Sequence, residues 1–275
     1  MRPVLLALLA LSACADATRS TPPAGPSAAI PYRLDAPDAV VALPAELREI
    51  SGLTVLPSGR LGAVQDEAGT IFEIDPATGV IVDRLVFETA GDFEGLATTD
   101  DAVWVLRSDG DLYRVARDST GMPSARKVET RLKSRNDTEG LAFDAAQNRL
   151  LVACKEWPGD DLGRVRAVYA FDLATETMSE TPVFALDREA VDSAVNFRPS
   201  ALAIHPTTGG LYVLSSVRRA IAVVGPDGAL VGIADLPGDV APQPEGLAFT
   251  ADGTLYVSSE GPSGPGTLLR YAPTD

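Results

Sequence analysis

The sequence predicts an all-β fold, a β-propeller of five four-stranded blades, with six blades as the alternative. A short motif recurs at a period near 45 residues, and short strands separated by turns fill each interval between the copies. Almost no segment has the 3.6-residue periodicity of an amphipathic helix. A chain of 275 residues is long enough for one such domain with a substantial core.

The recurring motif is clearest in residues 93–106, FEGLATTDDAVWVL. Five related copies are anchored, in chain order, at Ser51, Glu94, Glu139, Ser200 and Glu245. The anchors are separated by 43, 45, 61 and 45 residues. We assign the long interval to an insert at 188–199 and a longer loop at 157–166; a degenerate sixth blade is the alternative.

Each unit has the strand order of a propeller blade. In the second unit we expect strands at 95–98, 102–107 and 112–116, followed by a more polar, edge-like strand at 125–132. The last unit, from Glu245 to Asp275, has room for only three strands. Residues 39–44, AVVALP, precede the first anchor and belong to no complete unit. We predict that they supply the missing outer strand and close the ring.

The N-terminus has the pattern of a lipoprotein leader. Arg2 precedes an apolar run that is too short to span a bilayer, and Leu11-Ser12-Ala13-Cys14 resembles a lipobox. An ordinary signal peptide is the alternative. We expect residues 1–13 to be a signal peptide, 14–33 a lipidated Cys14 with a flexible tether, and 34–275 one propeller domain. Because position 15 is Ala, the resemblance implies an outer-membrane lipoprotein facing the periplasm or the surface.

The repeated glutamates are expected at one rim of the central channel. In a blade the innermost strand runs antiparallel to the second, so the start of one adjoins the end of the other. The expected rim residues are Glu94, Glu139, Glu245, Asp66, Glu67, Arg107, Lys155, Glu156, Ser215, Ser259 and Glu260. The preceding loops add Asp92, Asn136, Asp137 and Arg198.

Carboxylates that lie close together must protonate, pair with a base such as Lys155 or Arg107, or bind a cation. Oxygen ligands suit a hard cation, Ca²⁺ or Mg²⁺, with the glutamates Glu94, Glu139 and Glu245 as candidate ligands. The alternative is that Glu-Gly is a turn device, in which the carboxylate accepts backbone N–H bonds and the glycine fits the channel wall.

Composition excludes several other chemistries. The net charge of −15 argues against nucleic acid as a partner, because phosphate binding needs Lys and Arg. The single histidine, His205, lies in a turn on the face opposite the rim, which rules out a zinc site with several histidines and disfavours a Ser-His-Asp triad. Cys154 and Trp104 lie in apolar strands and are expected in the core, and no disulfide is expected if Cys14 is lipidated.

The leader, the ISGL…QDE opening and the repeated FEGLA, TEGLAF and PEGLAF units resemble the SdiA-regulated family of bacterial propeller lipoproteins over roughly residues 35–272. The pattern is also similar to NHL-repeat, gluconolactonase-like and esterase-like phytase propellers. This resemblance implies a propeller and a calcium site near the channel, with Glu94, Glu139 or Glu245 as the glutamate ligand and Asn136 as a loop ligand. Only Lys155, Arg107, Arg135 and Arg198 are available for the basic rim of a phytase.

Two functions from different classes remain open. The first is a membrane-anchored, monomeric binding propeller that takes a small ligand, a divalent cation or an envelope protein at its acidic rim. The second is a calcium-dependent hydrolase acting on a lactone or a phosphoester, with Glu139 or Glu245 as base. Whether the protein is an enzyme is left open by the sequence.

Overall fold

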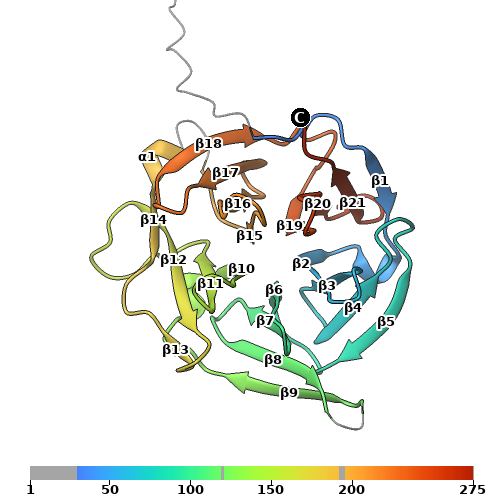
Figure 1. The fold of residues 1–275 in the computed structure, drawn as a ribbon, viewed down its shortest axis with the longest axis horizontal. Helices are drawn as coiled ribbons and strands as arrows, with labels where there is room; N and C mark the ends of the chain where they lie inside the picture. The colour runs from blue at the N-terminus through green and yellow to red at the C-terminus, as the bar shows by residue number, and fades with distance from the viewer. Residues whose placement is uncertain (1–29, 119–120, 192–195, 275) are drawn as a thin grey trace, which may run out of the picture.

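The computed structural model describes residues 30–118, 121–191 and 196–274, and within them it forms a five-bladed β-propeller (Figure 1). The signal peptide, Cys14 and most of the tether expected from the sequence lie outside the described residues. Each blade is an antiparallel sheet whose first strand borders the centre of the ring. The blades follow one another in chain order around the ring, as the colour gradient of Figure 1 shows.

The strands of the first four blades are as follows. Blade 1 contains β2 (Ile50–Val55), β3 (Leu61–Gln65), β4 (Thr70–Ile74) and β5 (Ile81–Val86). Blade 2 contains β6 (Phe93–Thr98), β7 (Val103–Arg107), β8 (Leu112–Arg117) and β9 (Pro123–Val128). Blade 3 contains β10 (Thr138–Asp144), β11 (Arg149–Cys154), β12 (Val165–Asp172), β13 (Thr177–Met178) and β14 (Phe184–Asp187). Blade 4 contains β15 (Ala201–Ile204), β16 (Leu211–Ser215), β17 (Ala220–Val224) and β18 (Leu230–Asp235).

Blade 5 joins the two ends of the chain. It contains β19 (Pro244–Phe249), β20 (Leu255–Ser259) and β21 (Thr267–Tyr271), and β1 (Ala39–Ala42) is its outermost strand. Strand β1 pairs antiparallel with β21 from Ala39 opposite Arg270 to Ala42 opposite Thr267. The predicted five blades and the predicted closing strand are therefore confirmed. A closed ring leaves only the outer edges of the blades unpaired.

The long interval in the repeat belongs to blade 3, and it does not hide a sixth blade. Its fourth strand is divided in two, because β13 and β14 both pair with β12. A short helix, α1 (Arg188–Val191), then leads toward blade 4. The remaining described helical segments are two 3-10 turns, Ala45–Leu47 and Ser134–Asn136.

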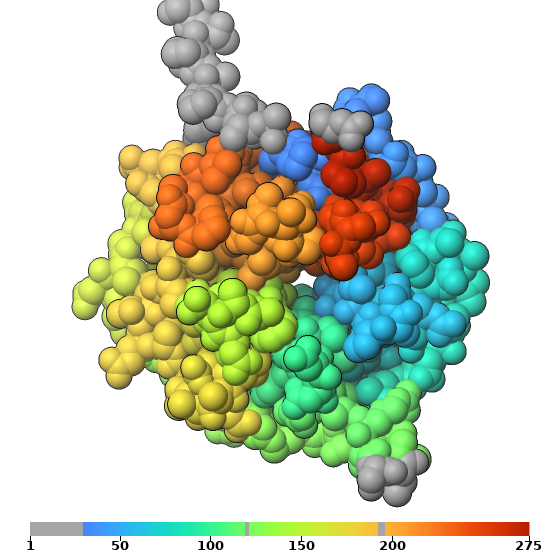
Figure 2. Space-filling view, in the orientation of Figure 1, coloured from blue at the N-terminus to red at the C-terminus, as the bar shows by residue number. Residues whose placement is uncertain are grey.

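The core lies between neighbouring blades. Alternating apolar residues of adjacent sheets form buried clusters, and the predicted core residues Trp104 and Cys154 are 3% and 0% exposed. The inner strands surround a channel, whose opening is visible at the centre of Figure 2. At the C-terminal ends of these strands the channel is lined by residues such as Leu96, Leu141 and Leu247 around a cavity of about 190 Å³.

The segment before β1 that contains Tyr32 packs at the seam between blades 4 and 5. The Tyr32 side chain is buried among Tyr212 and Phe249, and its hydroxyl donates a hydrogen bond to the Gly253 carbonyl at 2.6 Å. His205 lies in the turn after β15, as predicted, and its Nε2 is 3.0 Å from the Tyr32 hydroxyl. With 7% of its surface exposed, His205 is a packing residue of this seam.

Candidate functional site at the acidic channel rim

Each repeated glutamate occupies a β-bulge at the start of an inner strand. The pairing register shifts between Phe93 and Gly95 in blade 2, between Thr138 and Gly140 in blade 3, and between Pro244 and Gly246 in blade 5. Glu94, Glu139 and Glu245 are therefore the residues left out of the strand ladder. A bulge re-aims the side chain of its extra residue, which explains how three glutamates leave the sheet at the same end of the channel.

The glycine after each glutamate allows neighbouring inner strands to approach closely. A Cβ atom at Gly95 would lie 2.7 Å from the Leu141 Cβ and 2.8 Å from the Glu139 carbonyl oxygen of the next blade. A Cβ at Gly246 would lie 2.8 Å from the Ser51 carbonyl oxygen. The expectation that glycine fits the channel wall is thus met, and the Glu-Gly pair combines a close contact with a bulge.

Glu94 has an environment that opposes its negative charge. Burial, the nearby carboxylates of Glu139, Asp92 and Glu245, and a hydrogen bond to Asp92 together raise the pKa of Glu94 to about 10. Among the described residues, no Lys or Arg lies within salt-bridge distance of its carboxyl group. At neutral pH, Glu94 is consequently a neutral acid whose O–H donates a hydrogen bond to Asp92.

Glu139 is the glutamate with a basic partner. Its side chain is 7% exposed and forms a salt bridge with Lys155 at the end of β11. Burial raises the pKa of Glu139 to about 8, even though Lys155 acts in the opposite direction. Burial alone would lower the pKa of Lys155, but the Glu139 carboxylate outweighs it and the pKa is raised. Lys155 therefore pairs with Glu139 and not with Glu94.

Glu245 is held by neutral donors. The Ser216 hydroxyl donates to its Oε1 at 2.8 Å, and the Gln243 amide lies 3.4 Å from the same oxygen. Burial raises the pKa of Glu245 despite these hydrogen bonds. The hydrogen bonds recorded for Glu139 and Glu245 come from side chains, so the alternative in which these carboxylates cap backbone N–H groups has no support here.

A second group of carboxyls adjoins Glu245 on the side of blades 5 and 1. Gln243 donates to Glu260 at 2.6 Å. Burial and the charges of Glu245, Asp66 and Glu49 raise the pKa of Glu260 to about 7. Burial and the charges of Glu49 and Glu67 raise the pKa of Asp66, whose Oδ1 is buried with no hydrogen-bond partner. The rim thus carries several carboxyls that are costly to ionise together.

Other residues expected at the rim have different contacts. Arg107 donates to Asp109 and to Asp111 at 2.9 Å, within its own hairpin, so it does not neutralise Glu94. Asn136 is 2% exposed; its Oδ1 accepts from the Lys133 N–H at 2.8 Å. Its Nδ2 donates to the Trp157 carbonyl at 2.9 Å. Both residues stabilise loops beside the rim.

The remaining predicted positions are distributed around the same end of the channel. Glu156 forms a salt bridge with Arg198, and Glu67 is exposed. The hydroxyl of Ser215 accepts the backbone N–H of Arg198 at 2.9 Å. The hydroxyl of Ser259 accepts the N–H of Gln243 at 3.1 Å. Each of these two buried serines holds the loop that leads into the inner strand of its own blade.

Sequence reasoning missed Gln243 and Glu49. A signal for them exists, because every blade has a polar residue two positions before its anchor: Glu49, Asp92, Asp137, Arg198 and Gln243. The residue between this position and the anchor is buried in all five blades, being Ile50, Phe93, Thr138, Pro199 and Pro244. Successive side chains of a strand point to opposite faces of the sheet. The polar residue two positions before the anchor and the anchor itself therefore lie on the same face.

The arrangement does not form a ready metal site. No group of three or more His, Cys, Asp or Glu side chains within residues 30–118, 121–191 and 196–274 is placed to hold a metal ion. The Glu139 carboxyl group is already paired with Lys155. Both polar atoms of the Asn136 side chain are already used in hydrogen bonds within the neighbouring loops. The calcium site therefore stays a prediction. No helix in the described part of the chain is both long and apolar enough to cross a membrane.

Solved structures with similar folds include several enzymes. Glutaminyl cyclase from Myxococcus xanthus has a TM-score of 0.59 and 16% identity, covering 87% of this chain and 97% of that chain. A gluconolactonase from Xanthomonas campestris has a TM-score of 0.53 and 16% identity, covering 81% and 72%. A luciferin-regenerating enzyme has a TM-score of 0.53 and 14% identity, covering 86% and 95%. At such identities the similarity shows the propeller fold alone.

No curated protein matches the sequence. Residues 34–264, which include all five inner strands and the whole acidic rim, match the SdiA-regulated family. That range covers most of the chain and agrees with the resemblance seen in the repeated EGL units. The protein is a member of the SdiA-regulated family.

Proposed function

We propose that this protein is a binding propeller of the cell envelope, whose acidic rim takes up the cationic group of a small ligand. The observation that carries the proposal is the state of Glu94, a half-buried carboxyl near Asp92, Glu139 and Glu245 with no basic partner among the described residues. An incoming cation would supply the missing counterion. Its binding would favour the ionised form of Glu94, whose pKa in the free protein is about 10.

Uptake of a cation at the rim should release a proton. The affinity should therefore rise with pH, by up to about tenfold per unit between pH 6 and 8. Calorimetry with putrescine and with CaCl₂, each in two buffers of different ionisation enthalpy, measures both the affinity and the proton release. We expect Glu94→Gln to abolish binding and Glu129→Gln, at an exposed position, to preserve it.

The two probes distinguish the kind of cation. Heat with putrescine supports recognition of an organic ammonium group. Heat with CaCl₂ alone supports a calcium site formed after Glu139 and Glu245 rearrange. Absence of binding by both probes, or binding that is unchanged in Glu94→Gln, contradicts a cation site at this rim.

Attachment to a membrane is the second part of the proposal, and the lipobox-like Leu11-Ser12-Ala13-Cys14 supports it. Cells fed a labelled fatty acid should transfer the label to the protein, and Cys14→Ala should abolish that transfer. A soluble, unlabelled mature protein would instead indicate an ordinary secretory signal. Several acyl chains would anchor the domain stably, whereas one chain gives weak binding.

A hydrolase remains the alternative function, and one observation favours it. The pKa values of Glu139 and Glu260 are displaced to about 8 and about 7, which is the range useful for proton transfer near neutral pH. A screen of lactones and phosphomonoesters, with and without calcium, tests this reading. Turnover that Glu139→Gln abolishes would favour an enzyme, and uniform inactivity would favour the binding protein.

A further inference from the structure

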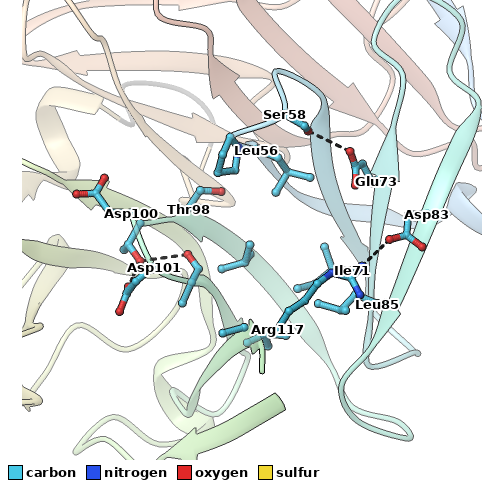
Figure 3. A pocket seen from close by; sticks show the side chains of 16 residues that line it. Leu56, Ser58, Ile71, Glu73, Asp83, Leu85, Thr98, Asp100, Asp101 and Arg117 are labelled. Carbon is cyan, nitrogen blue, oxygen red and sulfur yellow. Dashed lines mark hydrogen bonds and ion pairs between the residues drawn. The ribbon is translucent and has the colours of Figure 1, made fainter. Parts of the chain in front are cut away.

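A second candidate site lies between blades 1 and 2, at the end of the strands opposite the acidic rim. The turns after β2 and β6 border a cavity of about 370 Å³ (Figure 3). Its apolar wall includes Ile71, Leu85, Val103 and Val115, contributed by both blades. The size is in the range of small-molecule pockets, and the wall removes apolar ligand surface from water.

The propeller itself contains a filled counterpart of this cavity. At the seam between blades 4 and 5, the Tyr32 ring packs against His205, Tyr212 and Phe249 at centroid distances of 6.3, 6.3 and 5.9 Å. The Tyr32 hydroxyl is buried and donates a hydrogen bond to the Gly253 carbonyl oxygen. An aromatic ring from outside the blades is therefore the natural occupant of such a seam in this protein.

The repeat alignment explains why the equivalent seam is hollow. Leu56, Gly62 and Thr98 occupy the positions in blades 1 and 2 that His205, Tyr212 and Phe249 occupy in blades 4 and 5. The strand registers agree, since Gly62 pairs with Thr54 and Tyr212 with Ala203 at the same step of the first hairpin. Leu56 packs over Gly62, where a Cβ would lie 3.0 Å from its Cδ2, so the ring lost at the cavity wall is the one that Thr98 replaces. Among the described residues no segment of the chain enters in the role of Tyr32.

Charges at the mouth of the cavity indicate what the occupant carries. Three carboxylates at the mouth have basic partners: Glu73 with Arg60 at 3.2 Å, Asp83 with Arg117 at 2.6 Å, and Asp101 with Arg114 at 2.6 Å. Figure 3 shows the Asp83–Arg117 pair across the seam. Asp100 is exposed and has no salt bridge among the described residues. Asp100 is therefore the carboxylate of the cavity lining that has no basic partner.

We infer that the blade 1–2 cavity binds a small aromatic amine. The ring lies against Ile71, Val103 and Val115, as Tyr32 lies in its own seam, and the ammonium group lies at Asp100. The inference does not depend on the function proposed for the acidic rim, because the two sites are at opposite ends of the inner strands. A ligand of this size should bind with a Kd on the order of 1 mM.

Titration of the ¹⁵N-labelled domain with tyramine, followed by NMR, tests the inference. We expect chemical-shift changes to be centred on Ile71, Asp100 and Val115. Thr98→Phe, which copies the blade 5 residue Phe249, should abolish them by filling the cavity. Asp100→Asn should weaken binding about threefold, the size of an exposed ion pair, whereas Asp239→Asn at an exposed site elsewhere should not change it.

The controls separate this site from the rim and from misfolding. 3-(4-hydroxyphenyl)propionate, which has the same ring and the opposite charge, should bind more weakly than tyramine. Glu94→Gln should retain tyramine binding at the cavity, and an unchanged amide spectrum elsewhere shows that Thr98→Phe is folded. Shifts at Ile71, Asp100 and Val115 that persist in Thr98→Phe, or no shifts at these three residues at millimolar tyramine, would overturn the inference.

Discussion

Replacing Gly95 with alanine should destabilise the propeller by about 3 kcal/mol, the upper end of the cost of overpacking. The added methyl group would lie 2.7 Å from the Leu141 Cβ and 2.8 Å from the Glu139 carbonyl oxygen. Both atoms belong to the rigid inner strand of the next blade and cannot rotate away. Relief of the clash would separate two inner strands and open the ring at the channel, where the strands approach most closely.

Chemical denaturation of Gly95→Ala and of a matched glycine variant measures this effect. Gly264 has no heavy atom within 4 Å of the position of a Cβ, so Gly264→Ala should be nearly neutral. Gly246→Ala should behave like Gly95→Ala, because its methyl group would meet the Ser51 carbonyl oxygen of blade 1 at 2.8 Å. Equal stability of Gly95→Ala and Gly264→Ala would show that the inner strands separate at little cost.

Glu94→Gln should stabilise the protein by about 1–3 kcal/mol at pH 8, since each unit of pKa difference corresponds to 1.36 kcal/mol. The pKa of Glu94 is about 10 in the folded protein, against an ordinary value of 4.5. The neutral acid is thus favoured by folding. Its contribution to stability is complete below about pH 4.5 and is lost as pH rises toward 10. Glutamine keeps the neutral, hydrogen-bonding group and cannot ionise.

The same substitution at Glu139 should stabilise the protein less than Glu94→Gln does: burial also raises the pKa of Glu139, to about 8, but the change removes the carboxylate partner of Lys155. Glu139→Gln leaves Lys155, which is 26% exposed, without its carboxylate partner. Because Lys155 is partly open to solvent, the lost pair should offset about 1 kcal/mol of the gain. Denaturation curves of the wild type, Glu94→Gln, Glu139→Gln and Glu129→Gln between pH 5 and 9 compare the three sites. Parallel pH profiles for the wild type and Glu94→Gln would mean that Glu94 is ionised in the folded protein.

The architecture could be predicted from the repeat because a blade is defined locally. Strand length, turn residues and the EGL motif recur within about 45 residues, and a final unit with three strands requires a fourth from elsewhere. The apolar stretch at 39–44 was the available candidate, and β1 occupies that place. Trp104 and Cys154 were predicted in the core for the same local reason, an apolar strand with alternating neighbours.

The partners of the charged residues at the rim could not be predicted in this way. Arg107 and Lys155 both end the second strand of a blade, yet Lys155 reaches Glu139 whereas Arg107 pairs with Asp109 and Asp111. The difference arises because the hairpin after Arg107 supplies two carboxylates within four residues. The sequence predicted Asn136 as a metal ligand. In the structure its side-chain amide accepts a hydrogen bond from the Lys133 N–H and donates one to the Trp157 carbonyl. Side-chain competition of this kind depends on three-dimensional distances.

The sequence by itself determined the blades, their order, the closing strand and the end of the channel at which the glutamates gather, because these follow from strand periodicity and from repeat spacing. Tertiary structure alone decided which glutamate has a counterion, which seam between blades is filled and which is hollow. Those properties depend on how neighbouring blades meet. Lys155 pairs with Glu139 and Tyr32 fills the seam between blades 4 and 5, so Glu94 has no basic partner among the described residues and the seam between blades 1 and 2 contains a cavity.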